Sequence, residues 1–306
     1  MKRKTITAVL LALCLLLSSA FAEVERSPLL DAAFSMLEEG NPFLKSYNEH
    51  TGAQVEAVFP LGVCYYFGGQ DFDRMFRSLP DYALGTALET TKHYRAGTQY
   101  IYGFDCSGYT RWVYEQCGLE AHPGLAQMII LYNDYRGNYV YSNNSHINTP
   151  MPREKKYTVN WREVSTHLQV GDLLVCKKGA RHVMMYIGTL RSYGYTEQQV
   201  PELAEYLDHP LVIHCGPNPQ YEQRFNALIA ENRRYAQCGG TDGGVAVSLL
   251  GPFTADAPHT GKAGTKTVGW YELPDGYCLT VYEFDLDPNN ETCVTSYCWF
   301  RPNELQ

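Results

Sequence analysis

Three side chains in this sequence could together hydrolyse an amide bond: Cys106, His182 and His214. Such chemistry needs a thiolate that attacks the carbonyl carbon and an imidazole that stabilises the thiolate and later protonates the leaving amine. A third polar group must fix the imidazole tautomer. The separations along the chain are compatible with a helix packed across an antiparallel sheet, although spacing alone does not bring the three side chains together.

Cys106 stands at the predicted start of a helix. Apolar residues recur behind it at positions 109, 112, 113 and 117, which is the spacing of an amphipathic helix, and Gly118 is a natural stop. Asp105 is a good N-cap, so Cys106 would lie at the positive end of the helix dipole. We therefore expect a thiol pKa below the usual value of about 8.5. The same residues also fit an ordinary helix start that carries a disulfide-bonded or buried cysteine.

The two histidines lie at the ends of predicted strands. His182 opens an apolar run to Gly188, and His214 closes the run from Leu211. A turn at residues 170–172 leads into another buried strand, and residues 245–250 form a further one. A histidine on its own is more often a satisfied structural residue than a catalytic one, so these positions acquire meaning only in combination.

Helices are predicted in other stretches as well. Ser27-Pro28 is typical of a capped start, with a helical pattern over residues 27–52 that is broken at Gly40. Residues 81–94 and, within an inserted segment at 189–210, residues 197–208 also favour helix. The last forty residues alternate β-branched and aromatic residues with turns, which predicts a terminal hairpin.

Composition limits the class of protein. With 306 residues and 45% hydrophobic content, the chain can bury a sizeable core. Its formal charge of −8 and the absence of a basic run make nucleic-acid binding a poor fit. We therefore expect no nucleic-acid partner, and nothing in the composition specifies an oligomeric state.

The first 22 residues have the three parts of a secretory signal. A basic start at residues 2–4 precedes an apolar run and an A-x-A site that ends at Ala22. The apolar run is too short for a bilayer-spanning helix of roughly 20 residues. We expect cleavage near Ala22, no stable membrane anchor, and a protein that is secreted or held in the cell envelope.

The number of cysteines predicts at least one unpaired thiol. Nine of the ten cysteines would remain after cleavage at Ala22, and an odd number in an exported chain leaves at least one unpaired unless two chains are bridged. One reactive thiol with up to four disulfides fits this count. Neither a paired CxxC nor an HExxH spacing is present, so we expect no metal site and no cofactor.

Short motifs along residues 85–250 occur in a recognisable order. They are Gly97-Thr98-Gln99-Tyr100-Ile101-Tyr102-Gly103, Phe104-Asp105-Cys106-Ser107-Gly108-Tyr109, Val170-Gly171-Asp172-Leu173-Leu174, His182-Val183-Met184-Met185-Tyr186-Ile187-Gly188 and Val212-Ile213-His214. Together they resemble the motifs of the NlpC-type family of bacterial cell-wall cysteine peptidases.

The resemblance implies a fold and roles. The implied fold class is α+β and papain-like, with the nucleophile helix packed on an antiparallel sheet. By position, Cys106 matches the nucleophile, His182 the base and His214 the third polar residue. The family's substrate pocket would be lined by Tyr100, Asp105 and Ser107, and Tyr100 would also help to hold the acyl oxygen.

The chain departs from the family pattern at several points. The glycine-rich loop before Phe104 is shortened, and Met184-Met185 replaces a usually small position. The insertion at 189–210 separates the last two catalytic strands, and together with residues 132–160 it is a candidate specificity rim.

These motifs predict an exported endopeptidase that acts on peptidoglycan stem peptides beside γ-D-glutamyl through a Cys106 thioester. An amidase or a transpeptidase using the same Cys-His site is the alternative, as is a wall-binding module that has lost activity. The expected division is a signal peptide at 1–22, an N-terminal helical extension of unknown role at 23–80, a catalytic domain at 81–260 and a C-terminal β-hairpin segment at 261–306.

Overall fold

The computed structural model describes residues 27–37, 84–86, 96, 99–101, 104–119, 137–142, 161–178, 182–217, 243–251, 265–275, 278–284, 296–302 and 305. The predicted signal peptide and most of the N-terminal extension lie outside the described residues.

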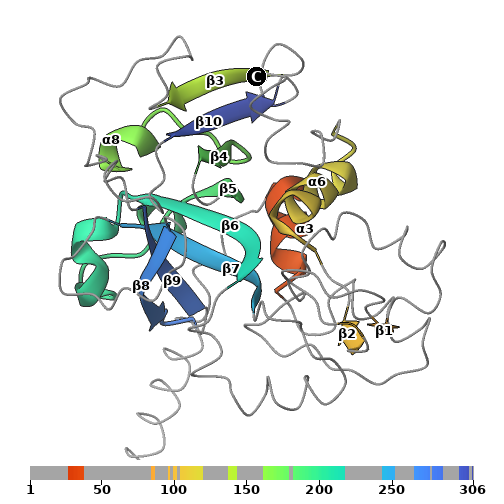
Figure 1. Cartoon of the computed structure of the whole chain (residues 1–306). Coiled ribbons are helices and arrows are strands. Elements are labelled where there is room, and N and C mark those ends of the chain that lie inside the picture. Colours follow the sequence, from red (N-terminus) through yellow and green to blue (C-terminus); the bar gives the residue numbers. More distant parts are fainter. Residues whose placement is uncertain are drawn as a thin grey trace, which may run out of the picture.

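An eight-stranded sheet dominates the described part of the chain (Figure 1). Its spatial order is β3 (Gly137–Ser142), β10 (Ser296–Pro302), β4 (Leu173–Lys178), β5 (His182–Thr189), β6 (Pro210–Pro217), β7 (Gly243–Leu250), β9 (Cys278–Phe284) and β8 (Thr265–Glu272). Neighbouring strands are antiparallel except β7 and β9, which are parallel. The strands predicted at 173, 182, 211 and 245 are thereby confirmed.

The central strands bury both of their faces, because successive side chains of a strand point to opposite sides. Along β5, Val183 and Met185 join the larger core and Met184 joins the smaller one. Met184 and Met185 therefore pack into the cores on opposite faces of the sheet.

Helices cover the two faces separately. Helix α6 (Cys106–Gln116) packs on β5 and β6, with α3 (Pro28–Ser35) against it, and residues of both helices belong to the larger core (Figure 1). The short helix α8 (Trp161–Ser165) packs near β6 and contributes to the smaller core. Helices on a largely antiparallel sheet define an α+β fold, as predicted.

Helix α3 gives the N-terminal extension a structural task. Ser27 caps it by accepting the N–H of Leu30 at 3.4 Å, as the Ser-Pro signal predicted. Ala33 and Phe34 are fully buried, and the carbonyl of Ala33 accepts the Tyr109 hydroxyl of α6 at 2.8 Å. Burying a phenylalanine stabilises a fold by roughly 1.5–3 kcal/mol. Helix α3 therefore fixes α6 on the sheet.

Two helix predictions are wrong. Leu84–Thr86 forms strand β1, which pairs with β2 (Gln99–Ile101), where the sequence pattern favoured helix over 81–94. Glycine and a β-branched threonine are poor helix formers, so strand pairing prevails there. Within 197–208 the chain forms the 3₁₀ helix η3 (Pro201–Tyr206), and η2 (Arg191–Tyr193) precedes it.

The C-terminal segment is part of the same sheet. Strands β8 and β9 form the antiparallel hairpin that the turn signals predicted, and β9 continues the sheet beside β7. Strand β10 lies between β3 and β4. The Arg301 guanidinium binds the fully buried Asp172 carboxylate at 2.7 Å, which ties β10 to the turn before β4. The sheet thus runs across residue 260.

The cysteines of the described residues include three with free thiols, Cys106, Cys117 and Cys176. If the chain is cleaved at Ala22, six other cysteines remain for at most three disulfides. The expectation of up to four disulfides is therefore wrong. Within the described ranges, no helix has the length and apolar character needed to cross a membrane.

Candidate active site

Cys106 is the first residue of α6, as predicted. The Asp105 carboxylate caps the helix by accepting the Gly108 N–H at 2.7 Å, and it also accepts the Ser107 hydroxyl at 2.9 Å. Asp105 and Ser107 are both buried. These two residues, predicted to line a substrate pocket, thus hold the start of the helix that carries the thiol.

The rest of α6 is anchored by buried tyrosines. Besides the Tyr109 bond to α3, the Tyr114 hydroxyl donates to the carbonyl of Gly171, in the turn before β4. The thiol of Cys215 donates to the Phe104 carbonyl at 3.2 Å, which attaches β6 to the residue just before the cap. The position of Cys106 is therefore fixed from both the helical layer and the sheet.

The Cys106 sulfur lies against the beginning of β5. The Val183 N–H is close enough to the sulfur to act against the rise of the thiol pKa, as are the N–H groups of Ser107 and Cys106. His182 directly precedes Val183 in the chain. The fold thus brings the cysteine thiol to the strand end that carries the predicted base.

His182 and His214 are joined in a hydrogen-bonded chain. Nε2 of His182 lies 2.9 Å from Nδ1 of His214, and the rings meet edge to face at 90°. Nε2 of His214 lies 2.9 Å from Oγ of Ser248, and both residues are fully buried. Because Nε2 of His182 is engaged, Nδ1 is the ring nitrogen left for a reacting thiol.

Burial keeps both the Cys106 thiol and the His182 imidazole neutral. Although Cys106 retains some exposed surface, burial raises its thiol pKa to about 12, with a further rise from the Asp105 charge. The three N–H groups act in the opposite direction. Burial lowers the pKa of His182 to about 4. The expectation that the helix start depresses the thiol pKa is not met, because desolvation outweighs the dipole and the hydrogen bonds.

Gly216 allows the histidines to approach. A Cβ at this position would lie 3.0 Å from Cε1 of His182 and 3.3 Å from Nδ1 of His214. Any larger residue would push against the ring pair.

Ser248 and Gly216 were missed by the sequence reasoning. The signal for Ser248 is a polar residue inside an apolar strand, and the signal for Gly216 is a glycine two residues after a predicted catalytic histidine.

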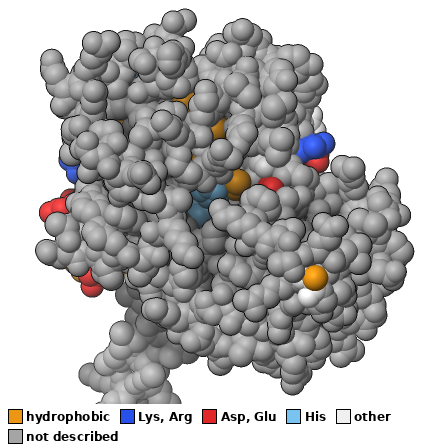
Figure 2. Space-filling view, in the orientation of Figure 1, with side chains coloured by type: hydrophobic (Ala, Val, Ile, Leu, Met, Phe, Trp, Pro, Cys, Tyr) orange, Lys and Arg blue, Asp and Glu red, His pale blue; other side chains and the backbone are white. Residues whose placement is uncertain are grey.

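A histidine surface is visible in a hollow at the middle of one face of the molecule, with hydrophobic and acidic atoms beside it (Figure 2). Tyr100, the third residue predicted to bind substrate, pairs through its backbone with Gly85 in the β1–β2 ribbon. Among the described residues, no group of three or more His, Cys, Asp or Glu side chains could hold a metal ion.

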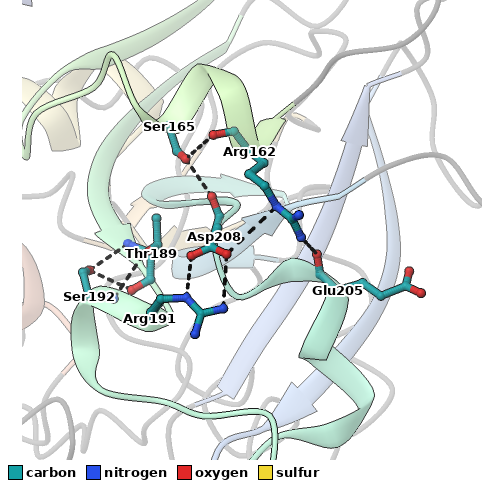
Figure 3. Close-up of polar contacts among 7 residues, drawn as sticks. All are labelled: Arg162, Ser165, Thr189, Arg191, Ser192, Glu205 and Asp208. Atoms are coloured by element: carbon teal, nitrogen blue, oxygen red, sulfur yellow. Dashed lines mark hydrogen bonds and ion pairs between the residues drawn. The ribbon is translucent and has the colours of Figure 1, made fainter.

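The insertion at 189–210 is placed away from this hollow. It leaves β5 after Thr189, seven residues from His182, which corresponds to about 23 Å of extended strand. Within the insertion Arg191 binds Asp208 at 2.6 Å, and Ser165 of α8 donates to the Asp208 carbonyl at 2.7 Å (Figure 3). The insertion thus begins at the end of β5 opposite His182, and most of 132–160, the other part of the predicted rim, lies outside the described residues.

Comparison with known proteins gives a family match. The model of the NlpC/P60 family matches residues 91–203, which is consistent with the NlpC-type family that the motifs predicted. No curated protein and no solved structure matches the chain. Cys106 and His182 lie inside the matched region, and His214, Gly216 and Ser248 follow it.

Proposed function

We propose that this protein is an exported cysteine peptidase that hydrolyses amide bonds in the peptide stems of peptidoglycan. The NlpC/P60 family suggests cell-wall peptidase activity. The observation that carries the proposal is geometric: Cys106 starts a helix that packs on β5, and β5 opens with His182, whose ring is hydrogen-bonded to His214. In this proposal the fold is papain-like in its detail, and the cleaved bond lies beside γ-D-glutamyl.

The reaction starts from the neutral pair. The Cys106 thiol gives its proton to Nδ1 of His182 as its sulfur forms a bond to the carbonyl carbon of the stem peptide. The developing thiolate is stabilised by the N–H groups around the sulfur. His214 accepts the Nε2–H of the imidazolium, so both ring protons of His182 have partners in this state.

Breakdown of the tetrahedral adduct completes acylation. The carbon–nitrogen bond breaks, the imidazolium gives its proton to the leaving amine, and a Cys106 thioester remains. A water molecule then attacks the thioester carbon while His182 takes a proton from it. The carbon–sulfur bond breaks, the proton returns to sulfur, and the peptide leaves as a carboxylic acid. Asp105 and Ser107 hold the helix start, and together with Tyr100 they line the substrate side of the site.

The test is digestion of purified peptidoglycan, with mass spectrometry of the released muropeptides. We expect Cys106→Ala to lose roughly a thousandfold or more in hydrolysis. Cys117→Ala is the matched control, because it removes a free thiol at the other end of the same helix and should hydrolyse like the parent.

The masses of the products separate the alternatives. Hydrolysis adds one water per cleaved bond, whereas a transpeptidase joins the acyl group to a second amine and an amidase releases a different pair of termini. A Cys106→Ala protein that digests peptidoglycan as well as the parent would contradict the proposal.

A further inference from the structure

Ser248 lies at the inner end of the histidine chain. It belongs to β7, where it is fully buried, and its hydroxyl oxygen is 2.9 Å from Nε2 of His214. In the β6–β7 register Ala246 is opposite His214 and Ser248 is opposite Val212. Ser248 is therefore the diagonal neighbour of His214 on the same face of the sheet, a distance that a histidine ring can span.

The proton positions in this chain follow from the reaction. When His182 holds the thiol proton, both of its ring nitrogens are donors. Nδ1 of His214 must then accept the Nε2–H of His182. Since burial and the neighbouring His182 lower the pKa of His214 well below its ordinary value, His214 stays neutral, and its single proton must be on Nε2. That proton faces the Ser248 oxygen.

We propose that Ser248 is a positioning residue: its hydroxyl accepts the Nε2–H of His214 and thereby keeps His182 in the tautomer whose Nδ1 can receive the Cys106 proton. The inference rests on the proposed function. Its direction is not fixed by geometry alone, because a serine hydroxyl can also donate. If Ser248 donated to Nε2 of His214, each bond in the chain would reverse, and Nδ1 of His182 would carry a hydrogen and could not act as a base.

Replacing Ser248 by alanine would leave the Nε2–H of His214 buried without this acceptor. An unmade hydrogen bond at a buried polar group costs about the equivalent of ten- to a hundredfold in an equilibrium. In the reversed arrangement Nε2 of His214 carries no hydrogen. Removing the Ser248 hydroxyl would therefore cost less free energy in that arrangement. The substitution should therefore shift His182 toward the unproductive tautomer.

The first measurement is kcat/KM on purified peptidoglycan fragments. We expect Ser248→Ala to lower it about ten- to a hundredfold and Ser248→Thr, which keeps the hydroxyl, to restore most of it. Ser165→Ala is the matched control, because Ser165 makes its bonds in the remote contact between α8 and the insertion, and this variant should react like the parent. Thermal unfolding of each variant shows whether the fold is retained.

The second measurement is the tautomer itself, read from the ring nitrogen shifts of ¹⁵N-histidine-labelled protein near neutral pH. The proposal requires a proton on Nε2 of both His182 and His214 in the parent, and a shift toward Nδ1 protonation of His182 in Ser248→Ala. A parent with a proton on Nδ1 of His182 overturns it, even if the alanine variant does not fold. A variant that changes kcat/KM without changing the tautomer, or the tautomer without kcat/KM, also overturns it.

The same experiments separate this inference from the proposed function. A parent protein that leaves peptidoglycan intact removes the proposed function. The nitrogen spectra of the parent and of Ser248→Ala then still decide whether the serine sets the protonation of the histidine chain.

Discussion

The two ends of the β5–β6 pair hold their polar side chains in opposite environments, one buried and one exposed. At the His182 end, three polar side chains are joined by two hydrogen bonds of 2.9 Å in a buried setting. At the other end, the insertion is held by charged contacts near the surface, where Arg191 is 52% exposed and Asp208 is 34% exposed (Figure 3). A missing hydrogen bond costs more free energy in the buried environment than in the exposed one. Side-chain positions are therefore more tightly defined at the end where the chemistry is proposed.

Two glycines provide the strongest test of this difference. Gly216→Ala places a methyl group 3.0 Å from the His182 ring, so we expect kcat/KM to fall by about ten- to a hundredfold because small displacements of a reacting group are expensive. Gly194→Ala lies in the insertion, at φ +85 and with open space around the added methyl. It should cost about 1 kcal/mol of unfolding free energy through backbone strain and leave kcat/KM unchanged. Equal kcat/KM losses in the two variants would contradict the comparison.

The pH profile tests the neutral pair. Below pH 4 His182 is protonated and cannot take the thiol proton, so kcat/KM should fall to half near pH 4. The thiol keeps its proton up to about pH 12. Between these limits the pair holds one proton, and we expect kcat/KM to be nearly constant from pH 5 to pH 9. A bell with both limbs inside that range would instead indicate the thiolate–imidazolium pair that the helix start suggested.

The smallest effect is expected at the exposed ion pair. Arg191→Ala removes two hydrogen bonds to Asp208, yet solvent already screens both charges. We expect the midpoint of thermal unfolding to fall by about 1 °C or less, with hydrolysis unchanged. A large loss of hydrolysis in Arg191→Ala would mean that the insertion communicates with the site.

Local patterns were sufficient to predict the parts of the site that depend on nearby residues. The Asp105 cap, the helix from Cys106 and the strand starting at His182 each follow from spacing within a short stretch. What depends on strand register was not predictable. Ser248 meets His214 only because β6 and β7 pair with one particular alignment, and no short-range signal specifies it.

The energetic balance at Cys106 was also beyond the sequence. A helix start favours an anion, and that local effect was recognised. The opposing effect is desolvation of the thiol by burial, which exists only in the folded chain. In the insertion, the pattern over 197–208 favoured a helix of that length, but the chain forms only a short 3₁₀ helix that begins at Pro201.

The position of β10 has a consequence for the order of folding. β10 is the last strand of the sheet to be synthesised, yet it lies between β3 and β4 and pairs with both. Until it emerges, β4 presents an open edge able to recruit a foreign strand. Closing this gap requires contacts of long sequence separation, which form slowly. A nascent chain stalled before residue 296 would therefore expose the unpaired edge of β4. This edge could pair with a strand of another chain while the rest of the sheet is nearly complete.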